Sequence, residues 1–229
     1  MNKLIENISL ETVKARHSVR SYTTQPISDE HKALLTEVIE ACNAQGGLHM
    51  QLVTDEPNSY AKSFWAHYGK FRNVRNYICL VGSKADGTEE KLGYYGEIVV
   101  LKAQAMGLNT CWTGLSYSKK NTIFKIDDGE KLYALIAVGY GDNEGVEHKS
   151  KKAEQVSSSL GLAPQWYKDG IDCALLAPTA INQQKFHFEL LLGNKVKATT
   201  GWGFYNEMDL GIAKLHFEIG VGCQEFEWI

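Results

Sequence analysis

One stretch of the sequence carries the clearest structural signal, residues 89–107, which read EEKLGYYGEIVVLKAQAMG. Its apolar side chains recur every three or four positions, as on the buried face of an α-helix: Leu92, Tyr95, Val99, Ala103 and Met106. Gly107 follows the last of them, and glycine commonly ends a helix. We therefore predict a long helix from residue 89 to residue 107.

Outward from this helix, apolar runs of strand length stand on both sides, at residues 77–81 and 132–138. Ser28 precedes two acidic residues, which predicts the start of a second helix. Polar residues with glycine at 141–152 are typical of a loop. Further helices are expected at 57–67, 165–176 and 204–219, and further strands at 48–53, 186–192 and 224–229, the last at a sheet edge.

Composition narrows the class of protein. The chain has 229 residues, which suits one large domain or two small lobes, and its net charge of −3 argues against a nucleic-acid partner. No apolar stretch approaches the ~20 residues that a membrane span needs, so no membrane association is expected. The five cysteines form no C-x-x-C pair, which suggests free thiols in a reducing cytoplasm.

Two pairs of segments resemble each other and occur in the same order. Residues 41–44 and 177–180 are each followed by a similar run, HMQLV at 49–53 and HFELL at 187–191. GYYGE at 93–97 resembles GFYNE at 203–207, and both open a predicted helix. This order predicts an internal duplication, with a first half at 1–152 and a shorter second half at 153–229.

A basic cluster near the N-terminus, residues 16–20, reads RHSVR. Two guanidinium groups flank a hydroxyl, and arginine forks match phosphate oxygens in charge and geometry. The cluster alone is explained as well by a solvated basic face. Its sequence R-x-S-V-R-x-Y resembles the R-x-S-x-R signature of FMN-dependent nitroreductases. This resemblance implies that Arg16, Ser18 and Arg20 hold the FMN phosphate and ribityl chain, and that His17 adds a backbone contact.

A second segment, APTAINQ at 177–183, resembles the A-P-S-x-x-N-x-Q segment of the same family. The resemblance implies contact with the isoalloxazine ring by Pro178, Thr179, Ala180, Asn182 and Gln183. Thr179 replaces the usual serine. The residue types alone also fit an ordinary turn before a strand, because proline, threonine and asparagine favour turns.

Two further resemblances add candidate residues. Residues 101–114 look like the family's long helix followed by G-L-x-T-x-W, which places Trp112, Thr113 and Gly114 near the flavin. After the turn at 139–141, the family has a basic residue that reaches the phosphate, and here Lys149 or Lys151 would serve. A core helix and strand, and a charged exposed loop, explain these two segments without a ligand.

The position of the second segment bears on the assembly. Most nitroreductases are homodimers in which one subunit supplies the arginines and the other supplies A-P-S-x-x-N soon after its own arginines. Here residues 41–47 lack those features, and the intact segment lies in the second half. The resemblance therefore implies a single-chain pseudo-dimer, with a monomer more expected than an obligate homodimer. The implied fold is α+β, a central sheet flanked by helices in two related halves.

The implied activity is that of an FMN-dependent oxidoreductase. NADH or NADPH would reduce the flavin, and a small-molecule acceptor such as a quinone or nitroaromatic would then be reduced in a ping-pong reaction. The flavin carries the chemistry, so no catalytic side chain is assigned. No metal is expected, because the histidines show no H-E-x-x-H spacing. A flavin-binding sensor or store without turnover would share these features, and a cofactor-free interaction module would leave the two motifs unexplained.

Overall fold

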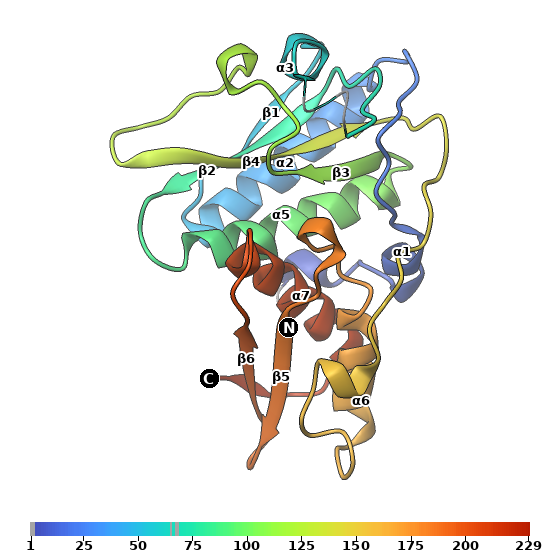
Figure 1. Cartoon of the computed structure of the whole chain (residues 1–229), viewed down its shortest axis with the longest axis vertical. Coiled ribbons are helices and arrows are strands. Elements are labelled where there is room, and N and C mark those ends of the chain that lie inside the picture. The colour runs from blue at the N-terminus through green and yellow to red at the C-terminus, as the bar shows by residue number, and fades with distance from the viewer. Residues whose placement is uncertain (1–2, 65, 67–68) are drawn as a thin grey trace. The chain divides into compact units, whose positions relative to one another are not determined.

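The computed structural model describes residues 3–64, 66 and 69–229. The chain divides into two compact units (Figure 1). The four-strand unit is built from Ala15–Thr88 and Val99–Glu147. The three-strand unit is built from the described part of Met1–Lys14, together with Glu89–Ile98 and His148–Ile229. Each unit has its own sheet and its own buried side chains.

The sheet of the four-strand unit is wholly antiparallel, in the order β1-β2-β4-β3. Its strands are β1 (Gln51–Val53), β2 (Tyr77–Ser83), β3 (Asn109–Thr113) and β4 (Glu130–Gly139). The apolar runs predicted at 77–81 and 132–138 are the two central strands, and nearly all their side chains are buried. These runs are apolar throughout because both faces of the central strands are covered.

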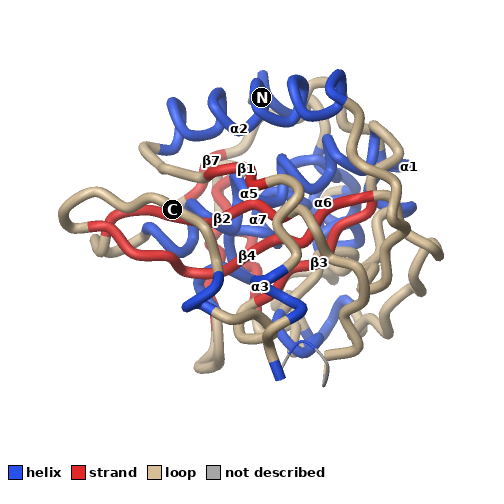
Figure 2. The backbone as a smooth tube through the Cα atoms, turned by 90° about the horizontal axis from the view of Figure 1, so that it is seen from above, coloured by secondary structure: helices blue, strands red, loops and turns tan. Residues whose placement is uncertain are grey.

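Two long helices begin and end where local signals place them, one within this unit and one with residues in both units. In α2 (Asp29–Gly46), seen above the strands in Figure 2, the Ser28 hydroxyl accepts a hydrogen bond from the His31 N–H at 3.2 Å. Gly47 ends the helix with a φ of +64°. The long helix α5 (Thr88–Ala105) confirms the prediction for 89–107, and Gly107 follows it with a φ of +77°. The short helix α3 covers Asn58–Ala61.

The three-strand unit places helices against a small sheet. Strands β5 (Phe186–Leu191) and β6 (Lys195–Thr200) pair antiparallel, and β7 (Glu227–Trp228) adds to β6 in parallel. Its helices are α6 (Gln165–Ala174) and α7 (Asn206–Val221), with α1 (Leu10–Ala15) near the N-terminus. Short 3-10 turns occur along the chain at Lys3–Ile5, Lys119–Asn121, Ala153–Gln155 and Ala180–Asn182.

The core of this unit is aromatic. Phe188 of β5 stacks on Phe217 of α7 with ring centroids 5.0 Å apart and planes 15° from parallel. The first half of α5 meets α7 backbone to backbone, because a Cβ added at Gly93 would collide with the Met208 carbonyl. A Cβ at Gly211 would likewise collide with the carbonyl of Glu90. Glycine is therefore required where the two helices touch.

Most sequence predictions of local structure are confirmed, and several differ from the structure. The strand predicted at 48–53 is limited to Gln51–Val53, because the Asn43 amide exchanges two hydrogen bonds, of 2.8 and 2.9 Å, with the backbone of Met50. The helix predicted at 57–67 is confirmed only over Asn58–Ala61, and Trp65 and His67 lie outside the described residues. Helix α1 and strand β6 were not predicted, and the strand predicted at 224–229 is confirmed only over Glu227–Trp228.

The α+β fold class is confirmed by the helices, the antiparallel four-stranded sheet and the mixed three-stranded sheet described above. Neither the internal duplication nor the division into halves at 1–152 and 153–229 is tested, and both stay predictions. In the part of the chain that the structure describes, no helix combines the length and the apolar character that crossing a membrane requires.

Candidate functional site

The arginine cluster lies along strand β3 in the four-strand unit. The N–H of Val19 donates to the Thr110 carbonyl at 3.0 Å, and Ser18 forms a parallel bridge with Thr110. Arg16 is only 4% exposed, whereas Arg20 is exposed. Because burial lowers the local dielectric constant, a guanidinium in this position interacts strongly with an anion.

The thiol of Cys111 shows how close the cluster's side chains are to one another. Burial raises the pKa of Cys111, while the charge of Arg20, a hydrogen bond with Ser18 and the charge of Arg16 oppose the rise. One buried atom therefore senses all three residues that the R-x-S-x-R pattern singled out. Arg16, Ser18 and Arg20 thus lie around the Cys111 thiol, and their role in holding FMN stays a prediction.

The turn after β4 runs beside the same cluster. The Thr23 N–H donates to the Tyr140 carbonyl at 2.8 Å. The His17 imidazole bonds the Glu144 carbonyl at 3.2 Å through Nδ1. At Gly145 the φ is +72°, and a Cβ there would lie 2.8 Å from the Cβ of His17. The segment 139–145 thus lies against residues 17–23, and the His17 side chain contacts this turn.

The third group of predicted residues lies at the end of β3. Trp112 pairs with Ile136 and Thr113 with Leu135 of β4. Thr113 is buried, and its hydroxyl donates to the Cys111 carbonyl at 3.3 Å. The Thr113 side chain therefore belongs to the core, and Gly114 follows the end of the strand.

The segment 177–184 lies in the three-strand unit, and Asp209 of α7 holds it. The Ala180 N–H donates to both carboxylate oxygens of Asp209, at 2.9 and 3.1 Å. The Gln183 amide donates to the same carboxylate at 2.7 Å. Asp209 is 4% exposed, and desolvation raises the pKa of its carboxyl to about 7. No sequence signal identified Asp209, because an acid in the first turn of a helix is commonplace.

The backbone of this segment is strained. Three residues that carry side chains adopt left-handed conformations, with φ of 48° at Ile181, 57° at Asn182 and 44° at Gln184. Such conformations cost on the order of 1–3 kcal/mol each and persist only where surrounding contacts impose them. Strain of this kind is concentrated at ligand sites in proteins.

The basic residues of the 141–152 loop belong to this second group. The Lys149 carbonyl accepts from the side-chain amides of Asn182 and Gln184, both at 2.9 Å. The Lys151 ammonium donates to the Gln184 carbonyl at 2.6 Å, whereas Lys149 is exposed. Gln184 is buried and was missed from the sequence, although it stands at the final position of the A-P-S-x-x-N-x-Q pattern.

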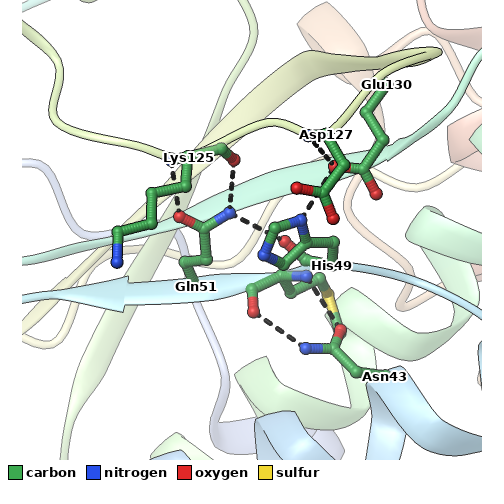
Figure 3. A network of polar contacts seen from close by, with 7 residues as sticks. Asn43, His49, Gln51, Lys125, Asp127 and Glu130 are labelled. Carbon is green, nitrogen blue, oxygen red and sulfur yellow. Dashed lines mark hydrogen bonds and ion pairs between the residues drawn. The ribbon is translucent and has the colours of Figure 1, made fainter.

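A separate polar network links β1 to the turn before β4 (Figure 3). Glu130 accepts hydrogen bonds from the His49 imidazole and the Asp127 N–H, both at 2.8 Å. These bonds, that of Asp127 first, lower the pKa of the Glu130 carboxyl. Within the described residues, His49, Asp127 and Glu130 are the set whose potential metal-ligand atoms lie within 4.8 Å of one another. Their hydrogen bonds alone account for the arrangement as a brace for the turn.

Comparisons with known proteins agree with this fold. A family model described as "Putative TM nitroreductase" matches residues 8–221. The crystal structure of a "putative nitroreductase" from Thermotoga maritima is similar with a TM-score of 0.65 and 19% identity, over 92% of this chain and 82% of that one.

A second solved structure is a "putative nitroreductase" from Desulfovibrio desulfuricans in complex with FMN. It has a TM-score of 0.50 and 18% identity, over 72% of this chain and 98% of that one. No curated protein sequence matches the chain. Because the family model covers most of the chain, this protein belongs to the nitroreductase family.

Proposed function

We propose that this protein is an FMN-dependent NAD(P)H oxidoreductase of the nitroreductase type. The observation that carries the proposal is the arginine cluster, in which Arg16, Ser18 and Arg20 are held together along β3 with the Arg16 side chain buried. Membership of the nitroreductase family supports it, and a relative of the same fold was solved in complex with FMN.

The chemistry of the donor set fits the phosphate of FMN. Two guanidinium groups and a hydroxyl offer several N–H and O–H donors and two positive charges, and a phosphate monoester offers oxygen acceptors with a charge between −1 and −2. We assign Arg16 and Arg20 to the phosphate and Ser18 to the phosphate or ribityl chain. Lys149 is the preferred additional cation, because the Lys151 ammonium already donates to the Gln184 carbonyl.

The segment 178–183 is proposed to pack on the isoalloxazine ring. The side-chain amides of Asn182 and Gln183 donate to groups within the protein, so their role is to shape the segment. Contact with the ring would come from Pro178, Thr179 and the backbone around Ala180. The backbone near Gly114 is assigned to the flavin edge on the same resemblance.

When bound, FMN would accept a hydride from NADH or NADPH and pass the electrons to a quinone, nitroaromatic or similar acceptor in a second half-reaction. The residues named above bind the phosphate, orient the ring and offer positive charge. No side chain is required as an acid or base, and we assign none. We further propose that the protein is cytoplasmic and monomeric, that it uses a small-molecule acceptor, and that it has no nucleic-acid or membrane partner.

An absorbance spectrum of the purified protein tests the cofactor. Yellow protein with oxidised-flavin bands, or uptake of added FMN with fluorescence quenching, is expected. Colourless protein that takes up no FMN would instead favour a cofactor-free interaction module. Steady-state oxidation of NADH or NADPH by a quinone then separates an enzyme from a flavin-binding sensor or store, because only the enzyme turns over.

A further inference from the structure

Two aromatic side chains on the loop before α7 face solvent. Trp202 is 90% exposed and Phe204 is 73% exposed. Neither contacts another aromatic ring among the residues that the structure describes. Exposed aromatic side chains in close succession are unusual on a soluble protein and commonly mark a binding surface. Together they form what we call the 202/204 pair.

The backbone under the 202/204 pair is held firmly. The Lys185 ammonium donates to the Trp202 carbonyl at 2.6 Å, and the Gln183 amide donates to the Phe204 carbonyl at 2.7 Å. Gly203 between them lies so close to Gln183 that an added Cβ would be 2.5 Å from its Oε1. The two rings are therefore exposed although their attachment points are fixed, which lowers the entropic cost of binding a ligand.

The same side chains connect the pair to the segment proposed for the flavin ring. Gln183 is the last residue of that segment, and its amide also donates to Asp209, which holds Ala180. Lys185 lies two residues further along the chain, and its carbonyl accepts from the Gly201 N–H at 3.0 Å. Hydrogen bonds thus connect the loop 201–205 to Gln183 and Lys185 of the neighbouring segment.

We propose that Trp202 and Phe204 are specificity-determining residues that bind the planar aromatic electron acceptor of this enzyme. The inference rests on the proposed function, because an acceptor would meet the 202/204 pair only if the neighbouring segment 178–183 contacts the flavin ring. A planar aromatic acceptor gains stacking energy on an indole or phenyl face, whereas an acceptor without a ring gains none. The pair therefore favours aromatic acceptors over inorganic ones.

Equilibrium binding is the first test. A naphthoquinone is titrated by calorimetry into the oxidised protein, saturated with FMN and free of NADH. The variant Trp202→Ala should raise the Kd about tenfold, since loss of stacking and apolar contact is worth about 1.4 kcal/mol. Trp202→Phe should recover most of the affinity. Leu192→Ala, which removes an exposed apolar side chain elsewhere in the unit, is the matched control and should leave the naphthoquinone Kd unchanged.

Steady-state kinetics is the second test. With saturating NADH or NADPH, Trp202→Ala and Phe204→Ala should raise the KM for the naphthoquinone and leave that for ferricyanide unchanged. FMN content should equal that of the unaltered protein. Equal effects on both acceptors, an unchanged quinone Kd, or an effect confined to the nicotinamide donor would each overturn the inference.

Two further results of these experiments would point to a different explanation. Absence of flavin from the unaltered protein would refute the proposed function itself. If Trp202→Ala instead abolished a concentration-dependent self-association seen by light scattering, the pair would be a contact between copies of this chain, and the acceptor assignment would be wrong.

Discussion

Asp209 offers the sharpest test of how the 177–184 segment is held. Its carboxylate accepts hydrogen bonds from the Ala180 N–H and the Gln183 amide while being 4% exposed. Desolvation raises its pKa from the ordinary value of 3.8 to about 7. The substitution Asp209→Asn keeps the shape of the side chain and removes the titration; it also replaces one acceptor oxygen by an NH2 group, which adds a pH-independent loss.

The sign and size of the effect follow from linkage. The folded protein binds the proton more tightly than the unfolded chain, so the stability that Asp209 contributes is complete below its unfolded pKa of 3.8 and is lost as the pH rises through 7. Between pH 5 and pH 8 this loss amounts to about 2.5 kcal/mol. The unfolding free energy of the unaltered protein, minus that of Asp209→Asn, should fall by about this amount over that range.

Urea unfolding at pH 5, 6, 7 and 8 measures the difference, with FMN removed so that ligand binding does not contribute. Every other titrating group is common to both proteins and cancels. Asp172→Asn makes the same chemical change at an exposed position of α6 and serves as the matched control. Parallel pH profiles for the unaltered protein and Asp209→Asn would refute the argument that burial controls this carboxyl.

Three further predictions follow from the site and the core. Arg20→Ala should raise the Kd for FMN about 10- to 100-fold, because a charged hydrogen bond is worth about 1.5–3 kcal/mol. The Kd for riboflavin, which lacks the phosphate, should barely change, and equal losses of affinity in fluorescence titrations would contradict the phosphate assignment. Gly211→Ala should destabilise the protein by roughly 1–3 kcal/mol or more, because its Cβ would meet the Glu90 carbonyl, whereas Gly161→Ala, with open space, should be near neutral in thermal unfolding. Light scattering with flavin quantitation should find a monomer with one FMN, and an obligate dimer whose site mixes Arg16 of one chain with Asn182 of the other would refute the single-chain site.

Elements with a strong local pattern could be predicted from the sequence. Helix α2 has its Ser28 cap, α5 has its three-to-four-residue apolar spacing, and the central strands β2 and β4 are apolar throughout. In each case the information lies within a few residues of where it acts. Strand β6 gives only a weak signal, because its exposed and less exposed residues alternate but few of them are apolar, and β5 and β7 pair with it.

Features that depend on distant parts of the chain could not be predicted. Gly93 and Gly211 weaken a helix when judged locally, and only the contact between α5 and α7 explains them. Asp209 reads as an ordinary acid in a first turn until the fold places Ala180 and Gln183 against it. The family pattern identified the motif residues, but the interactions that hold them in place come from elsewhere in the sequence.

These supporting interactions have a consequence for cofactor binding. The left-handed residues Ile181, Asn182 and Gln184 cost on the order of 1–3 kcal/mol each, and this cost falls on the folded chain whether or not a ligand is bound. Hydrogen bonds to Asp209 and to the Lys149 carbonyl hold the segment with protein groups alone. Because the strain is already offset in the protein, an arriving flavin would not have to order the segment, and more of its contact energy would appear as affinity.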